Sequence, residues 1–115
     1  MTKVKRRQVI FMEKIVQQGL LYDFYGELLT EHQREIYEDA VYNDMSLSEL
    51  ADNYGISRQG VHDLLKRCDK ILSEYENKLH LVSRFDKIKS KISRMGETDD
   101  LSQIRELAAE IMEEL

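Results

Sequence analysis

The chain has 115 residues, of which 42% are hydrophobic and 34% charged, and its formal net charge is −5. This acidic balance excludes a strongly basic protein that coats DNA, so any contact with nucleic acid has to be local. A single cysteine excludes an internal disulfide, and no apolar run approaches the about 20 residues that cross a membrane. We therefore expect a cytoplasmic protein with no membrane partner, built as one compact domain with a helical appendage.

The first eleven residues, MTKVKRRQVIF, differ from the rest of the chain because they carry a charge of +4. They lack the apolar stretch and the small-residue cleavage site of a signal peptide. We expect residues 1–11 to be a basic extension, either disordered or the product of an upstream start codon, and we favour the second explanation.

Every longer segment of the chain shows the helical period, and proline is absent. The fold is therefore predicted to be all-α, with five or six helices. Thr30 and Gln33 have the spacing of a capping box that opens one helix, and Asn43 with Asp44 ends it. The buried side of this helix is predicted to consist of Ile36, Tyr37, Ala40 and Val41.

Residues 46–67, SLSELADNYGISRQGVHDLLKR, have the pattern of a helix-turn-helix. Ser46 and Glu49 form a second capping box, Gly55 supplies the positive φ of a tight turn, and Ser57 is a natural N-cap. The small side chain of Ala51 lets two helices cross closely. The angle between the helices is predicted to be filled by Leu47, Val61 and Leu64.

The second helix of this motif is predicted to bury one side and to present polar side chains on the other, at about 100° per residue. Glutamine and arginine suit the edges of adenine and guanine, while lysine and a helix start suit phosphate. The candidate DNA-binding residues on and beside this helix are Ser57, Arg58, Gln59, His62, Lys66, Arg67 and Lys70. Asp63 is discordant because its carboxylate repels phosphate. The alternative is a solvated polar face that binds nothing.

Beyond this motif, apolar residues continue in steps of four and three, which is a heptad pattern. They are Val61, Leu65, Cys68, Leu72, Tyr75, Leu79 and Val82. The rhythm slips at Val82, where Ser83 and Asp86 could cap a new helix, so we predict a kink or break there. A last helix, capped by Asp99 or Asp100, is predicted to carry an apolar stripe of Leu101, Ile104, Ala108, Ile111 and Leu115. The predicted divisions are a helix-turn-helix domain over 12–82 and a C-terminal helical extension over 83–115.

Three motifs within residues 28–72 occur together: LTEHQRE (29–35), SLSELA (46–51) and GISRQGV (55–61). As a set they resemble region 4 of bacterial sigma factors, in which the second helix of the motif reads promoter DNA. The resemblance implies that Arg58, Gln59, His62 and Lys66 enter the major groove of double-stranded DNA and that Arg34 lies near the DNA backbone. A segment for opening promoter DNA is missing, and Gly60 weakens the recognition helix. The chain is therefore not expected to be a complete sigma factor.

The flanking stretches LLYDFYGELLT (20–30) and YENKLHLV (75–82) extend the similarity. With them, residues 12–95 resemble the YlxM-like family of small proteins, which look like a stand-alone sigma region 4 followed by a helical tail. Members of this family are commonly encoded beside the GTPase of the signal recognition particle. The resemblance thus implies a link to protein targeting.

Two functions follow from these observations. The first is a DNA-binding regulatory protein, and the second is a helical adaptor that binds protein or ribonucleoprotein components of the targeting machinery without reading DNA. We expect no enzymatic activity and no cofactor, because no catalytic constellation or phosphate loop occurs. His32, His62 and His80 are scattered, which argues against a metal site. Cys68 lies on the predicted buried seam and is read as a core residue.

The tail offers more apolar surface than a small domain requires. We expect a homodimer through the seam over 65–82 and the stripe over 101–115. Two recognition helices would then meet half-sites one DNA turn apart, about 34 Å.

Overall fold

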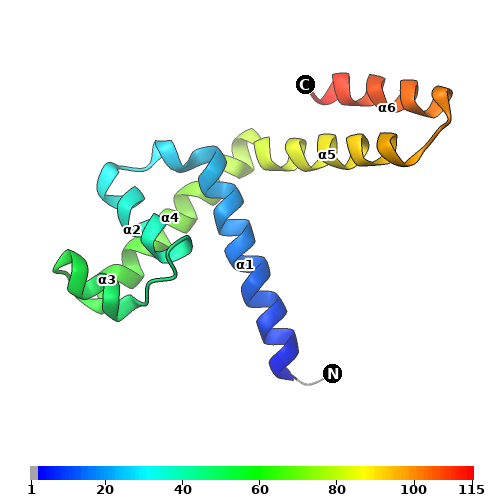
Figure 1. Ribbon diagram of the computed structural model, residues 1–115. Helices are drawn as coiled ribbons and strands as arrows, with labels where there is room; N and C mark the ends of the chain where they lie inside the picture. Colours follow the sequence, from blue (N-terminus) through cyan, green and yellow to red (C-terminus); the bar gives the residue numbers. More distant parts are fainter. Residues whose placement is uncertain (1–2) are drawn as a thin grey trace. The chain divides into compact units, whose positions relative to one another are not determined.

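The computed structural model describes the backbone of residues 3–115 and the side chains of residues 13–115. Six α-helices and one 3₁₀ turn make up this part of the chain, and no strand occurs in it (Figure 1), which confirms the all-α prediction. The elements are α1 (Lys3–Tyr25), η1 (Gly26–Leu28), α2 (Glu31–Val41), α3 (Leu47–Tyr54), α4 (Arg58–Leu79), α5 (Leu81–Glu97) and α6 (Leu101–Glu114). None of the helices over these residues combines the length and apolar content of a membrane span.

The chain divides into two compact units, Met1–Lys78 and Leu79–Leu115. The sequence predicted the division between residues 82 and 83, and the helix break lies slightly earlier. Helix α4 ends at Leu79, His80 has a left-handed φ of 57°, and α5 begins at Leu81. The His80 side chain makes no capping hydrogen bond to α5, so the break arises from the left-handed backbone of His80. The sequence therefore contains no capping pattern at this position.

The core of the first unit lies where α2, α3 and the start of α4 meet. Ile36, Leu50 and Val61 are fully buried there, and Ala51 is 8% exposed. The partly buried side chains packed around them are Ala40, Met45, Leu47, Tyr54, Ile56, Leu64 and Leu65. This core holds α3 and α4 together as the two arms of the predicted motif.

Both predicted capping boxes of the first unit are present. The Oγ1 atom of Thr30 accepts from the backbone N–H of Gln33 at 3.2 Å, and the Gln33 side chain accepts from the backbone N–H of Thr30 at 3.0 Å. Ser46 and Glu49 make the same reciprocal pair at 3.1 and 3.2 Å. These bonds satisfy backbone donors at the starts of α2 and α3 and fix where the two helices begin.

Tyrosine hydroxyls that donate to carboxylates connect the helices of the first unit. The hydroxyl of Tyr37 on α2 donates to Asp69 on α4 at 2.7 Å, and Asp69 also accepts from Gln18 on α1 at 3.0 Å. The other pairs of this kind are Tyr25 with Glu76, Tyr42 with Asp23, Tyr54 with Asp39 and Tyr22 with Glu38. Helices α1, α2 and α4 are therefore joined by polar bonds as well as by apolar packing.

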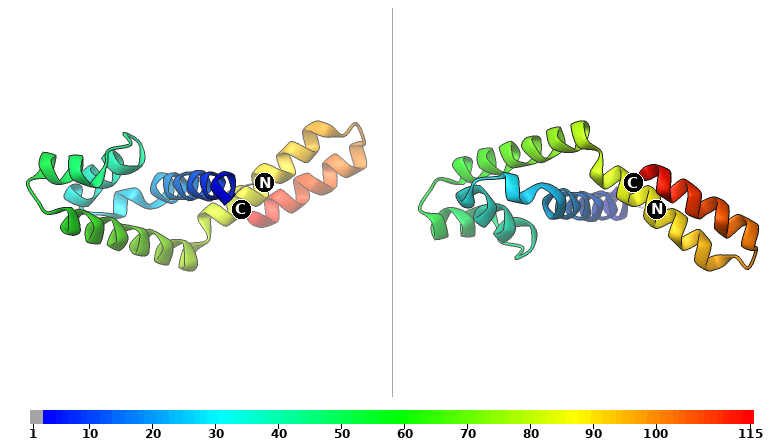
Figure 2. Two further views of the ribbon diagram at one scale, coloured as in Figure 1. Left: turned by 90° about the horizontal axis from the view of Figure 1, so that it is seen from below. Right: turned by 90° about the horizontal axis from the view of Figure 1, so that it is seen from above.

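In the second unit, α5 and α6 lie side by side and run antiparallel (Figures 1 and 2). The Oδ1 atom of Asp100 accepts from the backbone N–H of Ser102 at 3.0 Å, so Asp100 is the cap and not Asp99. The most buried side chain of α6 is Leu107, which the predicted stripe omitted, whereas Leu101 and Leu115 are 58% and 82% exposed. The inner side of α6 is thus rotated away from the predicted stripe by part of a turn.

Candidate nucleic-acid interface

The turn between α3 and α4 depends on one glycine. Gly55 has φ 68° and ψ 33°, and its N–H donates to the carbonyl of Ala51, as does that of Ile56 at 3.1 Å. A Cβ atom built on Gly55 would have no neighbour within 4 Å. The position therefore requires glycine for its left-handed backbone and not for space, which confirms the predicted reason for this residue.

Ser57 starts the second arm of the motif. Its Oγ atom accepts from the backbone N–H of Gly60 at 2.9 Å, and its carbonyl accepts from Val61 at 3.0 Å. The predicted N-cap is therefore present. The first N–H groups of a helix have no partner within it, so those at the start of α4 are suited to an anion.

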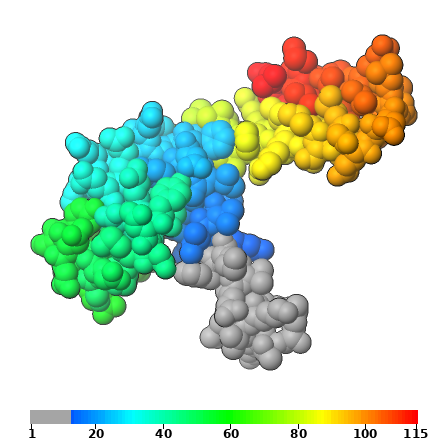
Figure 3. All heavy atoms as spheres, viewed as in Figure 1, coloured from blue at the N-terminus to red at the C-terminus, as the bar shows by residue number. Residues whose placement is uncertain are grey.

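The first turns of α4 separate apolar from polar side chains. Val61, Cys68 and Leu72 are fully buried on one side. All seven candidate residues on or beside α4 are exposed: Ser57, Arg58, Gln59, His62, Lys66, Arg67 and Lys70. Figure 3 shows the segment that contains α3 and the start of α4, coloured green, at the surface of the first unit. The structure thus brings seven of the eight predicted residues to one exposed stretch of helix.

Arg34, the eighth predicted residue, lies on α2 in a different setting. It lines a shallow hollow of about 220 Å³ with Glu31, Glu35 and Glu38, and its side chain is only partly exposed. Its Nε atom is buried and has no hydrogen-bond partner among residues 13–115. All four residues that line this hollow belong to α2, and the three beside Arg34 are acidic. The structure therefore does not bring Arg34 together with the α4 residues.

A second hollow, of about 390 Å³, lies between the start of α3 and the start of α4. Leu47, Arg58, Gln59 and His62 line it. This position places three of the candidate side chains around one concave area at the N-terminal turn of α4, where recognition helices contact bases.

Asp63 interacts with two of the candidate residues. Its Oδ1 atom accepts from the Nε2 atom of Gln59 at 2.9 Å and lies 3.6 Å from the Nδ1 atom of His62. The sequence analysis identified Asp63 as discordant, but it did not predict that the Asp63 carboxylate contacts Gln59 and His62. The signal was available, because Gln59 and Asp63 are four residues apart and share a side of the helix.

Within the described residues, neither the cysteine nor the side chains that could bind a metal form a site. The Cys68 thiol is buried, and its pKa is raised to about 11. Burial is the larger cause, and the negative charge of the nearby Asp69 carboxylate is the smaller one. No group of three His, Cys, Asp or Glu side chains within the described residues could hold a metal ion. Cys68 therefore packs as an apolar residue of the core.

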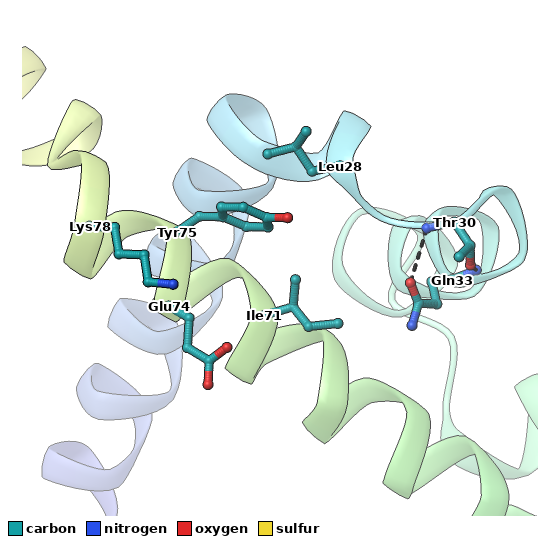
Figure 4. A pocket seen from close by; sticks show the side chains of 7 residues that line it. All are labelled: Leu28, Thr30, Gln33, Ile71, Glu74, Tyr75 and Lys78. Atoms are coloured by element: carbon teal, nitrogen blue, oxygen red, sulfur yellow. Dashed lines mark hydrogen bonds between the residues drawn. The ribbon is translucent and has the colours of Figure 1, made fainter.

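A larger hollow, of about 450 Å³, lies between η1, the start of α2 and the later turns of α4 (Figure 4). Leu28, Ile71 and Tyr75 give it apolar walls, while Glu74 and Lys78 carry opposite charges at its edge. Figure 4 also shows that the Gln33 side chain in this hollow is already engaged with the backbone of Thr30. The hollow lies at the opposite end of α4 from the candidate interface.

Comparison with known proteins relates the chain to one family. Residues 12–112 match the model of a family described as "Putative helix-turn-helix protein, YlxM / p13 like", UPF0122. A UPF0122 protein of Thermoanaerobacter sp. (strain X514) is 46% identical over 93 residues, which cover 81% of this chain and 80% of that protein. A relative from Caldanaerobacter subterraneus is 51% identical over 78 residues, or 68% and 67% of the two chains. One from Halalkalibacterium halodurans is 36% identical over 104 residues, or 90% and 95%.

Proposed function

Because the chain belongs to the YlxM/p13-like family of helix-turn-helix proteins, we propose that it binds double-stranded DNA with the start of α4 in the major groove. The observation that carries this proposal is the exposed polar side of α4, which stands opposite the buried Val61 and Cys68. The Gly55 turn and the shared core of α2, α3 and α4 hold this side in a fixed orientation.

The proposed contacts divide by their distance from the helix start. Arg58 and Gln59 lie on the first turn and reach base edges, for which their planar donor groups are suited. His62 follows on the next turn. Lys66 and Lys70, together with Arg67, contact phosphates on either side of the groove. Ser57 and the backbone N–H groups of the first turn hold one further phosphate.

Asp63 limits the strength of this interaction. Gln59 has to leave the Asp63 carboxylate before it can bond to a base, and the carboxylate itself repels phosphate. Non-specific binding is therefore weak. Selective binding depends on a base pair whose hydrogen bonds to Gln59 replace the bond that Gln59 makes to Asp63. The finer proposal is a regulator of transcription connected with the signal recognition particle pathway. It rests on the genomic association that the family resemblance implies.

Fluorescence anisotropy with genomic fragments at about 100 mM salt tests the DNA-binding proposal. Arg58→Ala and Lys66→Ala should each weaken a selective complex about tenfold, the loss of one good base or phosphate contact. Lys78→Ala is the matched control, because it removes another exposed lysine of α4 far from the helix start. Equal affinity of the three variants would contradict the proposal.

Asp63→Asn tests the role of the carboxylate in the same assay. It removes the negative charge and keeps the size of the side chain. We expect binding to become several-fold tighter and less selective, because phosphate repulsion is lost at every sequence. Unchanged affinity would show that Asp63 lies outside the interface.

The second candidate function is a helical adaptor for protein or ribonucleoprotein components of the targeting machinery. The contacts of Asp63 with Gln59 and His62 favour it, because they engage two side chains that DNA would need and leave a carboxylate beside them. If no fragment binds selectively, the adaptor is the better explanation. Retention of the targeting GTPase by the immobilised full chain, lost on Arg58→Ala, is then the supporting result.

We further propose that the chain forms a homodimer, so that two copies of α4 meet DNA half-sites about one helical turn apart. The exposed apolar residues of the C-terminal helices support this proposal. Sedimentation of the wild-type chain at micromolar concentration tests it, and a single 13.6 kDa species would reject it.

A further inference from the structure

Asp63 lies in the middle of the exposed side of α4, where the proposed contacts with DNA are made. It follows Val61 by two residues, which at about 100° per residue places it almost opposite that buried side chain. Gln59 lies four residues before it and Lys66 three residues after it, so all three share one side of the helix. The Asp63 side chain is 58% exposed. A base pair that meets this side of α4 therefore meets the carboxylate as well.

Two neighbours on the same helix contact Asp63 in the free protein. Its Oδ1 atom accepts from the Nε2 atom of Gln59 at 2.9 Å and lies 3.6 Å from the Nδ1 atom of His62. When Gln59 turns towards a base, this oxygen loses its hydrogen-bond donor. The complex has to supply another donor, because a carboxylate that is removed from water without one is costly.

The major groove contains few groups that can replace Gln59 as the donor. An ionised carboxylate only accepts hydrogen bonds. The base edges in this groove carry two kinds of donor, the N4 amino group of cytosine and the N6 amino group of adenine. Adenine also has the N7 acceptor beside N6, which repels a carboxylate, whereas cytosine has no acceptor beside N4. Cytosine is therefore the base that suits Asp63.

We infer that Asp63 determines specificity at one base pair of the DNA site, where its carboxylate accepts a hydrogen bond from N4 of cytosine. The inference rests on the proposed binding of DNA by α4 and adds one base to the sequence that α4 selects. Selectivity comes mainly from the bases that Asp63 disfavours. At thymine or guanine the carboxylate has lost Gln59 and faces acceptors instead of a donor.

Selection from a random library of double-stranded DNA by the immobilised full chain, followed by sequencing, tests the inference. The wild-type chain should enrich a sequence in which one position requires cytosine. Asp63→Asn should lose the requirement at this position and keep the others, because an amide both accepts and donates hydrogen bonds. Glu74→Gln is the matched control, since it removes an exposed carboxylate later on α4 and should keep every preference.

Anisotropy measurements on two duplexes give the size of the effect. One duplex has the selected sequence, and in the other a T·A pair replaces the selected C·G pair, which exchanges the N4 donor for the O4 acceptor. This exchange should weaken binding of the wild-type chain about tenfold and that of Asp63→Asn less than about threefold. The ratio of the two effects separates base recognition from the general gain in affinity that loss of a negative charge brings.

The outcomes distinguish the inference from the proposal on which it rests. If the wild-type chain enriches no sequence, selective DNA binding fails and the inference fails with it. If it enriches a sequence and Asp63→Asn keeps every base preference, or loses one at a base other than cytosine, DNA binding stands and the role of Asp63 is overturned. Loss of the preference at one cytosine by Asp63→Asn, but not by Glu74→Gln, supports the inference.

Discussion

The two units of this chain are built from similar amphipathic helices but complete their cores differently. In the first unit, α2, α3 and α4 surround Ile36, Leu50 and Val61, and tyrosine–carboxylate bonds connect the helices. In the second unit, α5 and α6 bury little besides Val82 and Leu107, and five of their large apolar side chains stay exposed. The comparison shows that apolar periodicity predicts helices equally well in both units. The number of helices that pack together determines how much apolar surface each unit buries.

The largest expected effect contrasts a buried leucine of the first unit with an exposed leucine of the second. Leu50→Ala should lower the free energy of unfolding by about 3 kcal/mol, because it leaves a cavity in a fully buried site. Leu101→Ala, where the side chain is 58% exposed, should change it by less than about 0.5 kcal/mol in a monomer. Urea denaturation followed by circular dichroism measures both. Similar values would remove the distinction between the units.

A second contrast compares the polar bonds of the two units. Tyr37→Phe removes a buried hydroxyl that donates to Asp69 at 2.7 Å and should cost about 1–2 kcal/mol. Glu114→Gln removes one side of a 3.9 Å ion pair near the surface and should cost less than about 0.5 kcal/mol. The same denaturation experiment applies. A Tyr37→Phe variant as stable as the wild type would show that the Asp69 bond adds nothing.

Glycine provides the third contrast, between the turn at Gly55 and the helical Gly96. Gly55→Ala should destabilise the first unit by about 1 kcal/mol, because alanine is strained at φ 68°. Gly96→Ala should stabilise α5 by about 0.5 kcal/mol, since a Cβ there has no neighbour within 4 Å and alanine favours helix. Thermal unfolding of the two variants gives the signs directly. Stabilisation by Gly55→Ala would contradict the assigned reason for the turn.

The smallest expected effect concerns pH. The hydrogen bonds from Tyr54 and Asn43 hold the pKa of Asp39 below its ordinary value of 3.8. A carboxyl group with a lowered folded-state pKa adds stability above its unfolded-state pKa, and this contribution disappears as the pH falls through the folded-state value. Tyr54→Phe should therefore destabilise the chain at neutral pH and lose most of that effect at a pH below the Asp39 pKa. Denaturation at both pH values checks this, and a difference independent of pH would contradict it.

The parts of the fold that sequence predicted are those with a local signal. Thr30 and Ser46 each stand three residues before the glutamine or glutamate that completes the cap, and Gly55 marks a turn that other residues avoid. The break at His80 has no such signal, because no sequence pattern in the neighbouring residues marks a histidine with a left-handed backbone. Ser83 and Asp86 resembled a cap and shifted the predicted break by about one turn of helix.

The candidate interface shows the same limit. The exposed side of α4 followed from spacing alone, because Val61 and Cys68 define the opposite side. The setting of Arg34 did not, since it depends on glutamates that surround it in the folded chain. The tyrosine–carboxylate bonds also join residues up to 51 positions apart, which no local pattern reveals.

The buried thiol of Cys68 has a practical consequence for measuring the motions of this protein. The sequence contains no other cysteine, and a thiol with a pKa of about 11 inside a packed core is almost entirely in its unreactive protonated form at neutral pH. A cysteine introduced on an exposed turn of either unit would accordingly be the one position that a maleimide fluorophore or a nitroxide modifies. The wild-type background thus allows site-specific spectroscopic labels without first replacing a core residue.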